Sequence, residues 1–190
     1  MFLTFDVSLI ILVPRLKKKG EVMLLIIFLL IVGIIGRFLP HAPNFTPVIA
    51  VALFGGLYLP RRYSLIVTIL LLAVSDLIIG WHNTMPFTWS CLALIALGGT
   101  LLREHKSFPM ILGASMTVAL FFFVVTNFGV WVVGGLYPQT AEGLAQCFAM
   151  ALPFFRTTLF STVLYMTLFF SVNELAAATA KNSRFAFLIR

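Results

Sequence analysis

The stretch RRYSLIVTILLLAVSDLII, residues 61–79, begins with two arginines, continues as an apolar run and carries one carboxylate, Asp76, near its far end. An apolar run from Tyr63 to Ile79 is typical of a helix that crosses a membrane. The two arginines predict its direction, because short cationic loops resist translocation and stay in the cytoplasm. We therefore expect Asp76 to lie about one helical turn below the outer end of this span.

Other apolar stretches lie on both sides of this one, and together they predict an all-α integral membrane protein, a bundle of six transmembrane helices. The predicted spans are Val22–Phe38, Phe45–Leu59, Tyr63–Ile79, Phe87–Leu102, Pro109–Val133 and Phe154–Val172. Several are at or below the ~20 residues that usually cross the bilayer core. Short spans suit a compact bundle whose ends open into a water-filled cavity.

Composition supports this fold class. The chain is 61% hydrophobic and only 10% charged, which leaves little polar surface for a water-soluble fold. Its net charge of +7 does not indicate a nucleic-acid partner, because the cations lie at the ends of apolar spans instead of forming one basic patch. The lipid bilayer is the expected partner, and a multi-pass location in the bacterial inner membrane follows.

The cations also predict the topology. Eleven of the 13 Lys and Arg residues fall in four clusters that one assignment places entirely in the cytoplasm, with both chain termini. The clusters are Arg15 with Lys17, Lys18 and Lys19; Arg61 with Arg62; Arg103 with Lys106; and Lys181, Arg184 and Arg190. Arg37 and Arg156 are the exceptions. Both fall near the outer face, where orientation requires no cation, so they are the first candidates for a functional role.

The chain divides into one membrane domain and two short ends. Residues 1–22 form an N-terminal extension, interpreted either as an interfacial helix or as sequence upstream of a true start at Met23. Residues 23–175 form the six-helix membrane domain, and residues 176–190 form a cytoplasmic tail.

Polar and aromatic residues collect at the predicted outer face, in the mixture that lines small-molecule pockets. Ordinary loop polarity with an interfacial belt of aromatic residues is the alternative explanation. Asp76 is harder to explain in that way, because a carboxylate within a span must be paired, hydrated or protonated. The residues we expect to bind a ligand are Arg37, His41, Asn44, Asp76, His82, Asn127, Trp131, Tyr137 and Arg156.

Asp76 and Arg156 lie at comparable predicted depths, so we expect them to form an ion pair that borders the cavity. A purely structural pair is the alternative.

Residues 141–152 also allow two interpretations. They form either a short helix, capped by Thr140 and separated from the last span by Pro153, that lies along the outer surface as a lid, or simply an extended start of that span.

The sequence predicts no enzyme, no cofactor and no metal site. It contains no G-x-S-x-G, H-E-x-x-H or Walker A motif. His41 and His82, with Asp76 and Cys91, match no fixed metal-ligand spacing, so loop hydrogen bonding is favoured for both histidines. Cys91 and Cys147 read as small buried apolar residues. The small residues Gly33, Gly36, Ala52, Gly56, Gly98 and Gly99 predict close helix contacts.

Several motifs resemble an uncharacterised family of bacterial inner-membrane proteins, over nearly all of residues 24–172. They are RFLPHAPNFTP (37–47), ALFGG (52–56), SDL (75–77), HNTM (82–85), TNFGVW (126–131), GGLYP (134–138) and PFFRTT (153–158). In size, number of spans and outward polar residues, the chain is also similar to the substrate-binding S-components of energy-coupling-factor vitamin transporters, including the solitary cobalamin-uptake type. That second resemblance is one of architecture alone.

These resemblances and the outer residues predict capture of a small, vitamin- or cofactor-like molecule from the periplasmic side. Uptake would then require toppling of the protein or an energising ATPase module or other membrane partner, because the chain has no nucleotide-binding motif. The alternative is a membrane scaffold subunit of a larger complex that transports nothing. A metal-dependent enzyme is a distant third interpretation.

Overall fold

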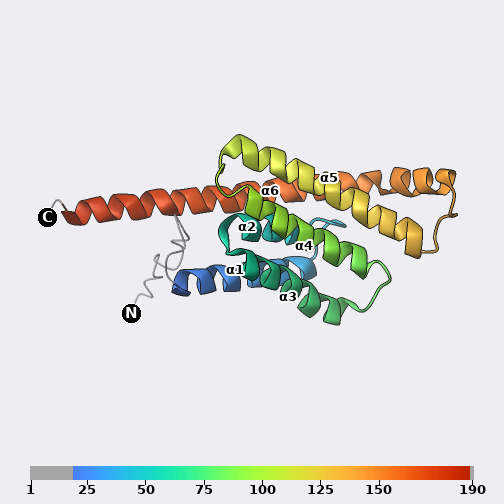
Figure 1. The fold of residues 1–190 in the computed structure, drawn as a ribbon, viewed down its shortest axis with the longest axis horizontal. Helices are drawn as coiled ribbons and strands as arrows, with labels where there is room; N and C mark the ends of the chain where they lie inside the picture. The colour runs from blue at the N-terminus through green and yellow to red at the C-terminus, as the bar shows by residue number, and fades with distance from the viewer. Residues whose placement is uncertain (1–18, 189–190) are drawn as a thin grey trace.

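The structure, a computed structural model, describes residues 19–188, so most of the predicted N-terminal extension lies outside the described residues. In this range the chain forms helices only, which agrees with the predicted all-α class (Figure 1). The helices are α1 (Lys19–Phe38), α2 (Val48–Tyr58), α3 (Arg61–Ile79), α4 (Met85–Leu101), α5 (Phe108–Val133) and α6 (Ala141–Leu188).

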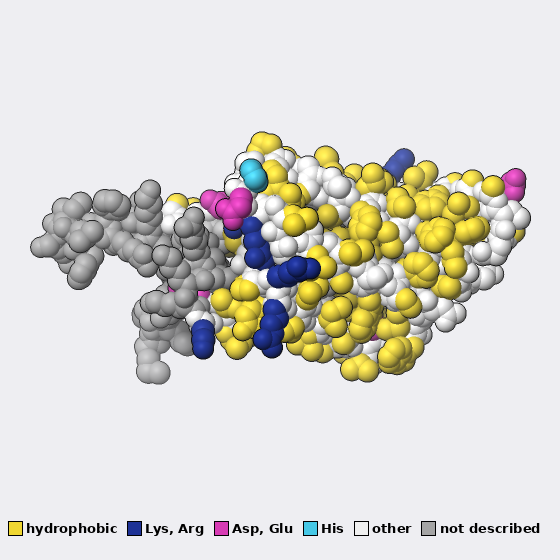
Figure 2. Space-filling view, viewed as in Figure 1, with side chains coloured by type: hydrophobic (Ala, Val, Ile, Leu, Met, Phe, Trp, Pro, Cys, Tyr) yellow, Lys and Arg dark blue, Asp and Glu magenta, His cyan; other side chains and the backbone are white. Residues whose placement is uncertain are grey.

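Four helical segments are long and apolar enough to cross a membrane: Lys19–Phe38, Arg61–Ile79, Phe108–Val133 and Ala141–Ala178. Hydrophobic side chains cover most of the visible surface, and Lys and Arg side chains gather near one end of it (Figure 2). We call this the cationic end and define it by Arg61, Arg62, Arg103 and Lys106. Together the four segments indicate a multi-pass membrane protein.

Helix α2 is the centre of the bundle. It has 11 residues, its residues 48–57 are all buried, and it contacts each of the other five helices. At 1.5 Å per residue it extends only about 16 Å, roughly half of the ~30 Å hydrocarbon core. The second predicted span is therefore a short core helix, and α4, with 17 residues, is also shorter than the four long segments.

Glycines bring α2 and α4 into backbone contact. A Cβ added at Gly56 would lie 2.3 Å from the Ala96 carbonyl oxygen, and one added at Gly99 would lie 2.7 Å from that of Leu53. Gly98 differs, because a Cβ there would meet nothing within 4 Å. The predicted close contacts are thus confirmed for Gly56 and Gly99 but not for Gly98.

Two further glycines place α1. A Cβ at Gly33 would lie 2.0 Å from Leu71 Cδ1 of α3, and one at Gly36 would lie 2.5 Å from Pro47, the residue that precedes α2. Helix α1 therefore packs closely against both α3 and the start of α2. This packing sets the position of Arg37, which follows Gly36 in the sequence.

Helix α6 runs without interruption from Ala141 through Pro153 to Leu188. Thr140 caps its start, because the Thr140 Oγ1 accepts a hydrogen bond from the Gly143 N–H at 3.2 Å. The first turns pack along α5, where the Cys147 thiol lies 3.5 Å from the Asn127 carbonyl oxygen. Of the two interpretations of residues 141–152, the structure supports the extended start over a separate lid helix. The predicted tail likewise continues as helix to Leu188.

Candidate functional site

A buried ion pair joins α1 and α3. Gly33 contacts Leu71, and one turn further along both helices Arg37 reaches the pair of residues Ser75 and Asp76. The Arg37 Nη1 lies 2.7 Å from the Asp76 Oδ1 and donates a hydrogen bond to the Ser75 Oγ at 2.6 Å. Because the side chain of Asp76 is only 2% exposed and that of Arg37 16%, the two charges face each other with little screening by water.

A third helix completes this network. The Trp89 indole N–H of α4 donates a hydrogen bond to the Asp76 Oδ2 at 2.8 Å. The other carboxylate oxygen, Oδ1, is buried and has Arg37 as an ion-pair partner but accepts no hydrogen bond of good geometry within residues 19–178. Arg37, Ser75, Asp76 and Trp89 therefore tie α1, α3 and α4 together through polar contacts inside an apolar bundle.

The predicted pairing of Asp76 with Arg156 is wrong. Asp76 pairs with Arg37, whereas Arg156 is an exposed residue of α6. The error has a simple physical reason. Equal depth along two helices does not make the helices neighbours, and the close contact at Gly33 puts α1 beside α3.

Next to the ion pair lies a cavity of about 210 Å³. The exposed residues His41 and Asn44 lie on its border, while buried apolar residues such as Leu72 form other parts of its wall. Residues from the α1 end, the following loop and helices α2 to α5 contribute to the lining. They are Arg37, His41, Asn44, Thr46, Val48, Ile49, Leu72, Thr88, Leu92 and Phe122.

The loop between α1 and α2, residues 39–47, is exposed over residues 39–44, and its last residues pack against α6. The Asn44 carbonyl oxygen accepts a hydrogen bond from the Ser161 Oγ at 3.4 Å, and Ser161 lies 20 residues, or about 30 Å, after the start of α6. The Phe45 ring packs against Phe160 and Tyr165 of the same helix. Irregular backbone at this depth is stable in a membrane only where protein buries it or where it lines a hydrated cavity.

Asn44 adopts an unusual backbone conformation, with φ of +64°. This left-handed region is unfavourable for most side chains but is accessible to asparagine. The Thr46 N–H donates a hydrogen bond to the Asn44 carbonyl oxygen at 3.0 Å, which closes a tight turn immediately before α2. The turn holds Asn44 at the cavity border and aims the chain into the bundle.

The start of α2 is uncapped and buried. No side chain caps this helix at its N-terminal end, and the N–H groups of Val48 and Ile49 have no protein acceptor among the residues that the structure describes. Both residues line the cavity and are at most 7% exposed. The N–H groups of a first helical turn point toward the N-terminus, so this end of α2 attracts hydrogen-bond acceptors and negative charge.

The opposite end of α2 is capped by Arg103. The Arg103 Nε donates a hydrogen bond to the Gly56 carbonyl oxygen at 2.9 Å, and the Arg103 Nη2 donates another to that of Leu59. The Lys106 Nζ lies 4.1 Å from the centroid of the Tyr58 ring. Cations at a helix C-terminus complement its dipole. Side chains therefore cap the C-terminal end of α2, whereas no side chain caps the end that faces the cavity.

Two side chains at the cavity offer further hydrogen-bonding groups. The His41 Nδ1 lies 2.8 Å from the Ala42 carbonyl oxygen, which makes Nδ1 the donor and leaves Nε2 as an acceptor in the neutral ring. Arg37 uses Nη1 for both of its contacts, so its Nε and Nη2 donors have no partner in the described part of the chain. The cavity thus combines guanidinium, backbone and amide donors with an imidazole acceptor.

Comparison with known proteins gives a family. Residues 17–184 match the model of a family of unknown function, DUF6580. The chain belongs to the DUF6580 family. No curated protein and no solved structure matches it. The region shared with DUF6580 includes all of the residues that line the cavity, together with Asp76 and Trp89.

In this DUF6580 protein, four of the nine predicted ligand-binding residues come together: Arg37, His41 and Asn44 line the cavity, and Asp76 lies against Arg37. The other five lie outside the cavity lining: His82, Asn127, Trp131, Tyr137 and Arg156.

Local contacts hold several of these five residues. The His82 Nδ1 lies 2.9 Å from the Thr84 Oγ1 in the loop before α4, and the Asn127 amide donates to the Phe123 carbonyl oxygen at 2.7 Å. The Trp131 indole donates to the Pro138 carbonyl oxygen at 2.9 Å, which closes the α5–α6 turn. His41, His82, Asp76 and Cys91, for which no metal site was predicted, do not come together as one group, because the described residues contain no group of three potential metal ligands.

The residue that sequence reasoning missed in this DUF6580 protein is Trp89. A signal for it exists: Asp76 lies three residues before Ile79, which ends α3, and Trp89 lies four residues after Met85, which begins α4. Residues at similar distances from a short connection between antiparallel helices lie at similar depths. Thr46 and Thr88, which also line the cavity, carry no comparable signal, because threonine is common in membrane helices.

Proposed function

We propose that this DUF6580 protein binds a small polar molecule in the cavity beside the Arg37–Asp76 pair. The observation that carries the proposal is the combination of a 210 Å³ cavity, a partly buried guanidinium with unused donors and an uncapped, buried helix N-terminus. Buried N–H groups without a partner are costly, so the site favours an occupant that accepts hydrogen bonds.

The chemistry of the lining favours an anionic group on this molecule. The free edge of Arg37 and the first N–H groups of α2 are both suited to a carboxylate or another oxyanion. Asp76 already balances part of the Arg37 charge, and the acceptor Nε2 of His41 suits a hydroxyl or amine elsewhere on the ligand.

Cavity volume limits the size of the ligand. At the ~30 Å³ that one water molecule occupies in the liquid, about seven waters would fill the space. Only a molecule at the small end of the vitamin- and cofactor-like range, or one polar part of a larger one, matches this volume. A ligand as large as cobalamin would require the loop 39–47 to move away from α6.

We propose a topology in which both termini are cytoplasmic and the loops that contain His41, His82 and Tyr137 face the periplasm of the bacterial inner membrane. In this arrangement the cationic end faces the cytoplasm (Figure 2). Helix α2 and the preceding loop cross the membrane together, because neither segment alone is long enough to span the hydrocarbon core. The loop then gives periplasmic molecules a route to the cavity through His41 and Asn44.

In this proposal, capture serves S-component-like uptake. The support is architectural: a compact bundle of six helices, with polar residues gathered in a cavity away from the cationic end. The sequence contains no nucleotide-binding motif, so an ATPase module or another membrane partner would supply the energy. The scaffold alternative predicts no bound small molecule and is separated by the same experiment.

Native mass spectrometry tests the proposal on protein purified gently in its own lipids. Wild type is expected to carry a small-molecule adduct that is not a lipid. Thr88→Leu places a larger apolar side chain in the cavity and should reduce adduct retention about tenfold or more, the equivalent of ~1.4 kcal/mol. The matched control is Thr157→Leu.

The control changes the same residue type outside the cavity. Thr157 also bonds the carbonyl four residues earlier, as Thr88 does, but it lies on α6. It should leave retention unchanged. Wild type without any adduct, or equal retention in Thr88→Leu and wild type, would remove the cavity as the binding site.

A further inference from the structure

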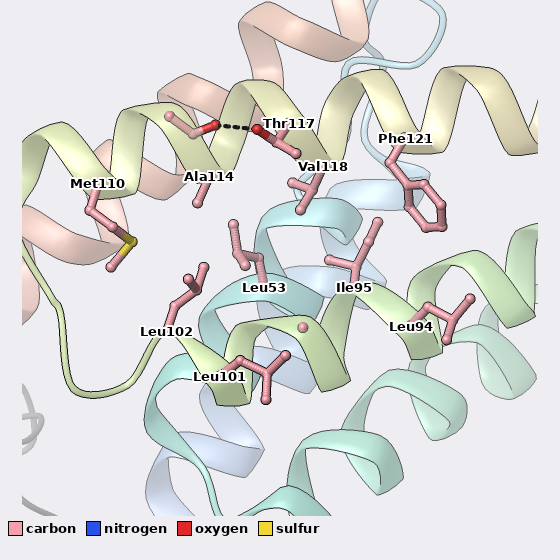
Figure 3. Close-up of a pocket in the computed structure, with 12 residues that line it drawn as sticks. Leu53, Leu94, Ile95, Leu101, Leu102, Met110, Ala114, Thr117, Val118 and Phe121 are labelled. Carbon is pink, nitrogen blue, oxygen red and sulfur yellow. Dashed lines mark hydrogen bonds between the residues drawn. The ribbon is translucent and has the colours of Figure 1, made fainter.

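A second and larger hollow, of about 700 Å³, lies between α4 and α5 with α2 behind it (Figure 3). We call it the α4–α5 groove. Side chains such as Leu94 and Leu101 of α4 and Met110 and Phe121 of α5 form its walls. The only hydroxyl in the lining, that of Thr117, donates to the Gly113 carbonyl oxygen within its own helix at 2.9 Å. The groove therefore offers an occupant apolar contact and no polar group.

Glycines keep the groove open. A Cβ added at Gly98 or at Gly113 would meet no atom within 4 Å, although both residues line the groove. Water has no hydrogen-bond partners on such a surface and would leave it dry. In a bilayer the natural occupant of a dry apolar groove is a hydrocarbon chain.

The groove ends beside a cluster of cations. The loop between the two walls carries Arg103 and Lys106, and it lies between Leu102 and Met110, which line the groove. Arg103 also binds the Leu59 carbonyl oxygen, which brings the start of α3, with the exposed Arg61 and Arg62, next to this loop.

The balance of charge at this end is positive. Two acidic residues lie at this end, Glu104 in the loop and Glu174 of α6 near the Tyr58 ring that Lys106 covers, so four cations outnumber two anions. Such a cluster attracts the phosphate of an anionic lipid. A protein helix seated in the groove would pack well against the small residues of the lining. It would not be stabilised by these charges.

We propose that the α4–α5 groove is a binding site for an anionic phospholipid. One acyl chain lies along the groove, past Gly98 and Gly113, and the phosphate is held by cations of the α4–α5 loop and the start of α3. This lipid links the loop that caps α2 to the surrounding membrane. The site is independent of the polar cavity, and the two can be tested separately.

The test uses the full chain in nanodiscs with equal amounts of phosphatidylglycerol and phosphatidylcholine that carry identical acyl chains. After transfer to a mild detergent, native mass spectrometry counts the lipids that remain bound. Wild type is expected to retain one phosphatidylglycerol in preference to phosphatidylcholine. Arg61→Gln and Arg62→Gln, at exposed cations of the start of α3, should each reduce this preference about fivefold, the effect expected for one cation near a headgroup.

Gly113→Leu tests the chain position, because its Cβ would meet no atom within 4 Å and the rest of the new side chain would occupy space in the groove. It should lose the retained lipid, whereas Gly20→Leu, at an equally open glycine of α1 outside the groove, should keep it. Equal retention of both lipids by wild type, or unaltered retention in Gly113→Leu, would overturn the proposal. So would a dimer or a protein partner that Gly113→Leu releases in place of a lipid.

Discussion

The Arg37–Asp76 ion pair is predicted to be a strongly coupled unit, and a double-mutant cycle measures the coupling. Asp76→Asn leaves the largely buried Arg37 without its counter-ion, and Arg37→Gln leaves the buried Asp76 without its counter-ion. Loss of one partner of a buried pair typically destabilises by about 3 to 5 kcal/mol, because the remaining charge stays desolvated. We take the lower end, about 3 kcal/mol for each variant, because Arg37 retains some exposure.

The double variant should lose much less than the sum. Two neutral amides at these positions can still hydrogen-bond, and the amide oxygen that Asp76→Asn introduces can still accept from Trp89, a bond that contributes about 1 kcal/mol. The expected coupling is at least ~2 kcal/mol. For a chain of this size about 3 kcal/mol corresponds to a loss of roughly 6 to 12 °C in Tm.

Thermal unfolding in a mild detergent, with wild type, both single variants and the double variant, gives the coupling. Arg156→Gln is the control, because Arg156 is exposed and does not pair with Asp76. Its combination with Asp76→Asn should be additive within about 0.5 kcal/mol. Additive losses for Arg37 and Asp76, or coupling between Arg156 and Asp76, would refute the arrangement described above.

Three other predictions use neighbouring or matched substitutions. Gly99→Ala should destabilise by more than about 2 kcal/mol, because its Cβ would overlap the backbone of α2. Gly98→Ala should be neutral or stabilise by up to ~1 kcal/mol through helix propensity. Denaturant unfolding compares the stability of the two variants. Asn44→Ala should destabilise by about 1 kcal/mol because of its positive φ, and Asn44→Gly should not; equal loss in the two variants would reject the left-handed turn. In the proposed topology, cysteines introduced at Asn83 and Arg62 react oppositely with an impermeant thiol reagent in intact cells, with Asn83 labelled, and labelling of Arg62 alone would reverse the topology.

Helix positions were largely predictable from the sequence, because long apolar runs and their flanking charges determine where α1, α3 and α5 begin and end. The position of α2 was predictable too, but its burial was not, since an apolar run has no polar face that distinguishes a core helix from a membrane span. The glycines at 33, 36, 56 and 99 were good signals, because close helix contact requires a missing side chain.

Arg37 was identifiable for a different reason: it is a cation that topology does not explain. Its partner was not identifiable, because sequence gives depth along a helix but not which helices are adjacent. The same limit explains why the sequence could not separate His41 and Asn44, which meet Arg37 at one cavity, from Asn127 and Trp131. Those two residues are equally suitable in composition but lie elsewhere.

An experimental structure of the gently purified protein, at a resolution that shows side chains, tests the central claim most directly. The claim is that the cavity formed by Arg37, His41 and Asn44 holds a small polar molecule. We predict density in this cavity that is continuous and larger than a water molecule, in contact with the free edge of Arg37 and the first turn of α2. Density that only separate waters explain, or a cavity closed by apolar side chains, would contradict the claim.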